Sequence, residues 1–279
     1  MSLTNREQQE ITRANDSGRV PVVFVHGLWL LPSSWQPWRD LFEENGFTTL
    51  APGWPDDPET VEEARANPSV FAGKKVGAVV AHFLEAIAAL QVKPAVVGHS
   101  FGGAFAQILA GRGVSRASVS IDPAPVRGVL PLPISTLRSA FPVLGNPLNA
   151  TRAVTLTFEQ YRYGWTNAVD EAEARSLYEA THVAAPGAPL FEGATANVNP
   201  FSALKADARN PDRGPLLFVS GGADHTVPHA ITNASYKRQA KNPGVTEIVE
   251  VEGRGHSLTI DSGWRDVADP ALAFVQRFS

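Results

Sequence analysis

Six short apolar runs, each followed within two residues by glycine or proline, constrain the fold of this chain more than any other feature. The runs cover residues 20–25, 48–51, 95–97, 117–121, 216–219 and 246–251. The first, VPVVFV, is continuously apolar and does not alternate, which is typical of a strand buried on both faces of a parallel sheet. The sequence therefore predicts a mostly parallel central sheet.

The intervals between these runs indicate helices. Residues 35–44, 75–90, 103–110 and 264–278 are of helical length, and their apolar side chains recur at helical spacing. Strands that alternate with helices indicate right-handed crossovers, with helices on both faces of the sheet. The predicted fold class is therefore α/β.

One interval is too long for a simple crossover, because 93 residues separate Asp122 from Leu216. An insertion that leaves the carboxyl end of a strand lies over the edge of the sheet where open α/β folds bind ligands. We therefore expect a helical cap, and an extra packing layer without substrate contact is the alternative. The expected organisation is a single domain over residues 1–279, with a core at 20–125 and 214–279 and a cap insertion at about 126–213.

The strongest chemical signal is the sequence GHSFGG at residues 98–103. It follows a predicted buried strand and opens a predicted helix, so Ser100 would occupy a strained corner with its Oγ clear of the sheet. The flanking glycines let the helix and the strands approach closely. We interpret Ser100 as a nucleophile, and a glycine-rich turn with an incidental serine is the alternative.

A serine nucleophile needs a base, and His256 is the predicted one. It follows the last apolar run in the sequence GRGHS, on a loop at the carboxyl edge of the sheet. We expect structural roles for His26, which would bond loop backbone, and for His99, which strand alternation turns away from Ser100. His82 and His182 are expected to be packing or surface residues. A metal site at His225 and His229 is not expected, because Pro228 disrupts regular helical spacing.

Two carboxylates follow predicted strands at the edge where His256 is expected. Asp224 follows the fifth run, 32 residues before His256, and is the favoured partner that would orient the imidazole. Asp122 follows the fourth run and stays open as the alternative acid. Asp261 is predicted to cap the final helix.

An oxyanion formed at Ser100 would need two backbone donors. One is expected from the amide of Phe101 and the other from the loop HGLW at residues 26–29. Leu28 N–H is the predicted second donor, with Trp29 N–H behind it. An apolar substrate pocket is predicted from aromatic side chains near these elements and in the cap, namely Trp29, Trp35, Phe101, Phe158, Tyr161 and Trp165.

The pair His26-Gly27, the run GHSFG at 98–102, Asp224 and His256 occur in an order that resembles the α/β-hydrolase superfamily. The resemblance extends from about residue 20 to 278 and is to its serine esterase and lipase-like branch. It implies a serine hydrolase with a cap between the fourth and fifth strands. Serine at position 100 differs from the aspartate of epoxide hydrolases and haloalkane dehalogenases. The usual N-terminal antiparallel strand pair is expected to be short or absent, because the first parallel strand begins by Val20.

Composition excludes several other classes. The chain has no cysteine, which excludes disulfides, cysteine zinc sites and a thiol nucleophile. A net charge of -4 provides no basic field for nucleic acid. The start is polar, which argues against a signal peptide, and no apolar run approaches the roughly 18 residues of a membrane span. We therefore expect a cytoplasmic enzyme without a nucleic-acid partner.

The predicted reaction is cofactor-free and metal-free hydrolysis of carboxylic esters of small to medium apolar substrates, through an acyl-enzyme on Ser100. The same constellation can cleave thioesters, lactones, amides or C–C bonds, or can catalyse perhydrolysis, and these alternatives stay open. A non-catalytic ligand-binding scaffold on the same fold is the further alternative.

Overall fold

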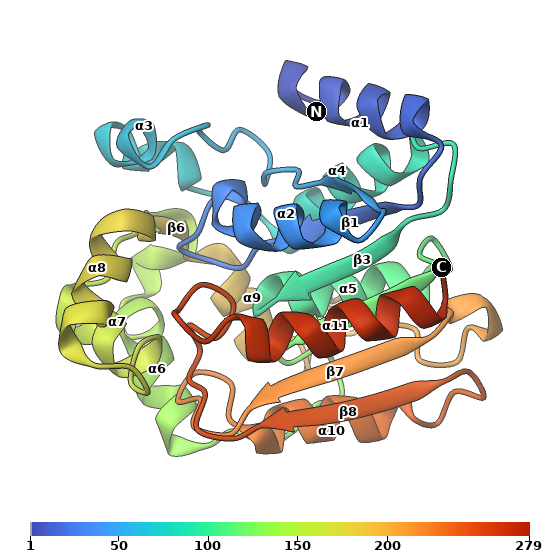
Figure 1. Cartoon of the computed structure of the whole chain (residues 1–279). Coiled ribbons are helices and arrows are strands. Elements are labelled where there is room, and N and C mark those ends of the chain that lie inside the picture. Colours follow the sequence, from blue (N-terminus) through green and yellow to red (C-terminus); the bar gives the residue numbers. More distant parts are fainter. Residues whose placement is uncertain (1) are drawn as a thin grey trace.

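The computed structural model describes residues 2–279, and six parallel strands form its central sheet (Figure 1). The strand order is β2-β1-β3-β4-β7-β8, and every neighbouring pair is parallel. Each predicted run forms a strand, and the predicted α/β class is confirmed. The strands are β1 (Pro21–Val25), β2 (Thr48–Leu50), β3 (Ala95–His99), β4 (Ala117–Ile121), β7 (Leu216–Gly221) and β8 (Thr246–Val251).

Helices cover both faces of the sheet. The face of α2 (Gln36–Glu44) and α11 (Arg265–Arg277) lies toward the viewer in Figure 1, and α4 (Val76–Ala88), α5 (Phe101–Gly111) and α10 (His229–Gln239) cover the other. Alternation along β1 divides its side chains between the two layers. Phe24 packs with α2 and α11, whereas Val23 and Val25 pack with α4 and α5.

The four predicted helices are present, and α10 is one that the sequence did not indicate. Its sequence, HAITNASYKRQ, is mostly polar, and Ile231 is its one buried large apolar side chain. Two more short elements follow β2, α3 (Val61–Ala66) and the 3₁₀ turn Pro68–Phe71, and a further 3₁₀ turn, Pro32–Trp35, leads into α2.

A helix takes the place of N-terminal strands. α1 (Asn5–Ser17) lies along β2, the edge strand of the sheet, and residues 2–20 form no strand. Arg13 donates to Thr49 O and Arg6 to Ala51 O, while Glu10 accepts the N–H of Ala51. An exposed strand edge promotes pairing with other chains, so α1 blocks this edge with side chains.

The long segment between β4 and β7 lies beyond the carboxyl ends of the strands, at the side to which the arrowheads point in Figure 1. It contains four helices, two 3₁₀ turns and a small antiparallel strand pair. These are α6 (Ile134–Leu144), Pro147–Thr151, β5 (Ala153–Val154), α7 (Phe158–Gly164), α8 (Glu171–Thr181), β6 (Ala185–Pro186), α9 (Ala188–Thr195) and Pro211–Arg213.

No helix among residues 2–279 combines the length and apolar character needed to cross a bilayer.

Candidate active site

Ser100 occupies the corner between β3 and α5 with a left-handed backbone, φ 58° and ψ −120°. A Cβ at Gly98 would lie 2.1 Å from the carbonyl oxygen of Gly102, and a Cβ at Gly102 would lie 2.0 Å from that of Val25. Side chains at these two positions would push the helix away from the strands. The corner therefore has the strained geometry that the glycine spacing predicted, and it raises Oγ above the end of β3.

Ser100, His256 and Asp224 come together at the carboxyl edge of the sheet. Ser100 Oγ lies 3.0 Å from His256 Nε2, and His256 Nδ1 lies 2.6 Å from Asp224 Oδ2. Both the imidazole and the carboxylate are buried. Since a carboxylate only accepts, Nδ1–H donates to Asp224 and Nε2 is left to accept the hydroxyl hydrogen of Ser100.

The insertion holds the loops that carry the imidazole and its carboxylate. The N–H of Ser257 donates to Trp165 O at 2.9 Å, and Asn167 Nδ2 donates to Ala223 O at 2.8 Å. The indole of Trp165 packs edge-on against the His256 ring, with centroids 4.7 Å apart. These contacts were not visible in the sequence, because they join segments that are far apart along the chain.

Asp224 is an ionised acceptor. Burial alone would raise its pKa, but the charge and the hydrogen bond of His256 outweigh burial and lower it below the usual value. Its second oxygen, Oδ1, accepts the N–H groups of Thr226 (2.6 Å) and Val227 (2.9 Å). The carboxylate therefore accepts hydrogen bonds from His256, Thr226 and Val227 and is directed at the imidazole.

Asp122, the alternative acid, is the neighbour of Asp224 and has a different environment. It is fully buried at φ 33°, and its carboxyl accepts the N–H of Gly221 at 2.9 Å. Burial, with the adjacent charge of Asp224, raises its pKa well above the usual value. No hydrogen bond joins it to His256. This environment favours the protonated form of Asp122, whose carboxyl can then donate a hydrogen bond to Asp224.

His99 is predicted to point away from Ser100, yet its ring contacts the ring of His256. The two rings lie 4.7 Å apart, and burial, followed by the charge of His256, lowers the pKa of His99 well below its usual value. The side chain does follow strand alternation, because Val97 on the same side of β3 packs in the layer of α11. His256 precedes α11, which covers this same face of the sheet, and its ring therefore contacts the His99 side chain on that face.

The loop after β1 lies against the corner of Ser100. A Cβ at Gly27 would lie 2.8 Å from Ser100 Cβ and 3.4 Å from its Oγ. The amides of Leu28 and Phe101, the predicted oxyanion donors, meet no acceptor among residues 2–279. Trp29 has a positive φ of 61°, and its indole N–H donates to Val154 O in the insertion.

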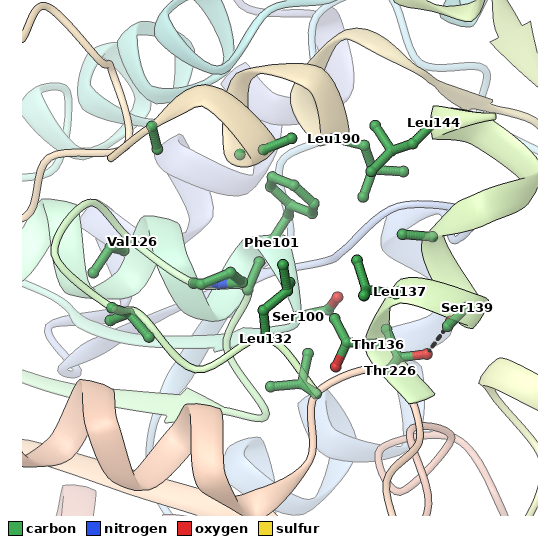
Figure 2. Close-up of a pocket in the computed structure, with 18 of the residues that line it drawn as sticks. Ser100, Phe101, Val126, Leu132, Thr136, Leu137, Ser139, Leu144, Leu190 and Thr226 are labelled. Atoms are coloured by element: carbon green, nitrogen blue, oxygen red, sulfur yellow. Dashed lines mark hydrogen bonds between the residues drawn. The ribbon is translucent and has the colours of Figure 1, made fainter. Parts of the chain in front are cut away.

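A cavity of about 230 Å³ opens at Ser100 between the sheet edge and the insertion (Figure 2). Its wall is mostly apolar and is formed by the loops that follow β1, β4 and β7 together with α6 and α9. Figure 2 shows Phe101, Leu132, Leu137 and Leu190 around the serine, with a small polar group formed by Ser139 and Thr226, whose hydroxyls lie 2.7 Å apart. An alkyl or aryl group fits such a wall better than a charged one.

The structure brings only two of the six aromatic residues predicted for the pocket to this cavity. Trp29 and Phe101 line the cavity, but Trp35, Phe158, Tyr161 and Trp165 do not. Trp35 lies on the α2 side of the sheet, and Phe158 packs on Tyr178. Tyr161 and Trp165 stack on each other as the interior of the insertion. Composition showed that the insertion is aromatic, but not which rings form its own core.

Four of the five remaining histidines have hydrogen-bond partners. His26 Nδ1 donates to Gly27 O, and its Nε2 lies 3.2 Å from Asp57, as expected for a residue that fixes loop backbone. His82 is buried against Glu7. His225 lies against Tyr163 O and His229 near Ser220, so they have separate partners.

Asp261 does not cap the last helix, contrary to the prediction. It accepts the hydroxyl of Ser257 at 2.8 Å and the N–H of Gly263, and it pairs with Arg254. Helix α11 begins after Trp264 without a side-chain cap. The reason is that residues 257–264 form a turn between His256 and the helix, and Asp261 stabilises that turn.

A family model described as "Alpha/beta hydrolase family" matches residues 22–269. The chain belongs to the alpha/beta hydrolase family. The match covers the sheet, the Ser100 corner, the insertion and the His256 loop, so the family predicted from the glycine-flanked serine and the later acid and histidine is confirmed. No curated protein matches this alpha/beta hydrolase in sequence.

Solved structures share the fold of this alpha/beta hydrolase at low identity. A monoacylglycerol lipase from Paleococcus ferrophilus is 18% identical with a TM-score of 0.63, and the match covers 93% of this chain and 95% of the lipase. An extracellular alpha/beta-hydrolase from a Paenibacillus species is 19% identical (TM-score 0.61; 91% and 98% covered). A putative non-heme bromoperoxidase from Mycobacterium tuberculosis is 16% identical (TM-score 0.62; 93% of each chain). These similarities establish the fold.

Proposed function

We propose that this alpha/beta hydrolase cleaves carboxylic esters of small to medium apolar substrates through a covalent acyl-enzyme. The observation that carries the proposal is the hydrogen-bonded series from Ser100 Oγ to His256 and from His256 to Asp224, placed at the floor of an apolar cavity. A hydroxyl, a base and a buried carboxylate in this order can perform acyl transfer.

In the first half-reaction, His256 Nε2 removes the hydroxyl proton as Ser100 Oγ bonds to the acyl carbon. The negative charge moves to the former carbonyl oxygen, which the free amides of Leu28 and Phe101 would stabilise. His256 then gives its proton to the departing alcohol, and the C–O bond breaks. In the second half-reaction, His256 takes a proton from water, the hydroxide bonds to the acyl carbon, and the proton returns to Ser100 as the acid leaves.

The cavity supports the substrate class. A volume of about 230 Å³ lined by leucine, valine, alanine and phenylalanine suits a medium-length acyl chain or an aryl group. We also propose that residues 126–213 act as a cap, since α6 and α9 supply one wall of that cavity. Ester cleavage is the activity that the name of the structurally similar monoacylglycerol lipase implies for that enzyme.

A panel of p-nitrophenyl esters of increasing acyl length, run on wild type and on Ser100→Ala, tests the proposal. We expect the wild type to hydrolyse medium-length esters best, with a burst of nitrophenol, and Ser100→Ala to lose nearly all turnover. Labelling by a fluorophosphonate separates enzyme from scaffold. A wild-type serine that neither reacts with this probe nor turns over any ester would refute the proposal.

The other acyl chemistries are arms of the same panel. Thioester, lactone and amide substrates, and acetate with hydrogen peroxide, are assayed beside the esters. A structurally similar protein is described as a putative non-heme bromoperoxidase, so the peroxide arm has a specific reason. If the thioester or peroxide rate exceeds the ester rate by tenfold or more, the preferred reaction is thioester hydrolysis or perhydrolysis, and the same three residues would catalyse it.

A further inference from the structure

Six large apolar side chains of the insertion are exposed to solvent, and three of them also line the cavity at Ser100. They belong to two segments of the insertion, residues 130–137 and 198–201, and their exposed fractions range from 46% to 92%. They are Leu130, Leu132, Ile134, Leu137, Val198 and Phe201, and we call them the rim. Single exposed apolar residues are common on protein surfaces, but a contiguous group beside a cavity marks an interaction site.

Hydrogen bonds show that the two segments of the rim lie side by side. Asn197 accepts the N–H of Gly128 at 2.6 Å and donates to Val129 O at 2.9 Å. Arg127 donates to Pro200 O at 2.9 Å. The start of the segment 130–137 therefore lies beside the segment 198–201.

The rim continues into the cavity. Leu130, Leu132 and Leu137 are exposed to solvent and also line the cavity at Ser100. Figure 2 shows Leu132 and Leu137 among the residues that line it. An apolar path therefore leads from the outer surface to the serine hydroxyl. An ester held in a lipid phase would keep its acyl chain out of water along this whole path.

The charge of these segments differs from that of the rest of the chain. Residues 123–158 and 193–206 contain no aspartate or glutamate, although acids make up 28 of the 279 residues. The same stretches carry four cations, Arg127, Arg138, Arg152 and Lys205. Although the net charge of the chain is -4, the two stretches that contain the rim therefore have no acid and a net positive charge.

We propose that the rim docks on a phospholipid surface that contains anionic head groups, and that the ester enters the cavity from that surface. The apolar side chains would insert below the head groups while the cations meet lipid phosphates. A second copy of the chain fits less well, because a symmetric contact would bring two cationic segments together. The entry of substrate rests on the proposed function, whereas the docking itself does not.

Vesicle sedimentation tests docking without turnover when Ser100→Ala is used as the protein. We expect binding to phosphatidylcholine vesicles that contain phosphatidylglycerol, and weaker binding to phosphatidylcholine alone or at high salt. In the same background, Ile134→Ser with Phe201→Ser should lower the partition coefficient about tenfold for each side chain removed. The matched control is Val92→Ser with Val245→Ser, which changes exposed valines at the opposite, amino end of β3 and β8.

A second measurement separates docking from the proposed chemistry. With Ser100 intact, the rim variant should hydrolyse a short water-soluble ester at the wild-type rate, because neither Ile134 nor Phe201 lines the cavity. On an ester embedded in anionic vesicles it should be at least about tenfold slower than the valine control. Equal binding by the two double variants, or equal binding to both vesicle types, would overturn the proposal. So would a dimer in sedimentation velocity that the rim variant abolishes.

Discussion

Replacement of Asp122 by asparagine tests the assignment of charge at the centre of the site. Asp122 and Asp224 are adjacent buried carboxyls, and their environments raise the pKa of Asp122 and lower that of Asp224, which favours a protonated Asp122 that donates a hydrogen bond to Asp224. An asparagine has the same shape, can donate from Nδ2 to Asp224, and can accept the N–H of Gly221 with Oδ1. We therefore expect Asp122→Asn to fold and to keep kcat/KM within about threefold of wild type.

The expected contrast with Asp224→Asn is large. Asparagine at position 224 would remove the charge opposite His256 Nδ1 and favour the tautomer that cannot accept the proton of Ser100. A loss of about three to four powers of ten in kcat corresponds to roughly 4–5.5 kcal/mol of barrier. Asp122→Ala would also leave the N–H of Gly221 without its acceptor, at about 1–3 kcal/mol of folding stability.

The assay is kcat/KM on one medium-length p-nitrophenyl ester for the three variants, beside urea unfolding at several pH values. Because the folded pKa of Asp122 is raised, the native state holds its proton longer than the unfolded chain. Wild-type stability should therefore fall relative to Asp122→Asn as pH rises above about 4. Loss of activity in Asp122→Asn with near-normal activity in Asp224→Asn would refute this reasoning and make Asp122 the ionised acid.

Three further outcomes are expected. Gly102→Ala should cost about 3 kcal/mol or more of unfolding free energy in urea, because its Cβ would lie 2.0 Å from Val25 O; a loss below about 1 kcal/mol would contradict the close approach. Leu190→Trp should fill the cavity and lower kcat/KM for a long-chain ester about tenfold or more relative to the acetate ester, so an unchanged ratio would place the acyl chain elsewhere. Burial lowers the pKa of His182 to about 3, so the unfolded chain takes up this proton first as pH falls. Wild type should then lose about 1.4 kcal/mol more stability than His182→Phe between pH 7.5 and 5.5, and parallel losses would contradict this.

Local sequence was sufficient for the sheet and for the corner at Ser100. A strand buried on both faces needs a continuous apolar run, and close helix packing beside a corner needs glycine, so residues 20–25 and 98–103 each permit few other structures. The loops that carry Asp224 and His256 followed from the same logic, because all strands of a parallel sheet end at one edge.

Features that depend on contacts between distant segments could not be read in this way. The ring of Trp165 packs on His256 and is buried inside the insertion, so it does not line the cavity. Which aromatic rings of the insertion are buried in this way depends on how its segments pack together. The polar sequence of α10 forms a helix because it covers β7 and β8. Asp261 accepts hydrogen bonds from Ser257 and Gly263 within its own turn. It therefore stabilises that turn and does not cap the helix that follows.

The two bonds from the insertion to the loops of the site limit how this fold can be recombined. Trp165 O holds the residue after His256, and Asn167 holds the residue before Asp224. A chimera that receives a foreign segment between β4 and β7 would lose both anchors along with its own pocket wall. The insertion and the loops that carry Asp224 and His256 are thus linked structurally, and a swap of whole insertions would require these two anchors to be rebuilt first.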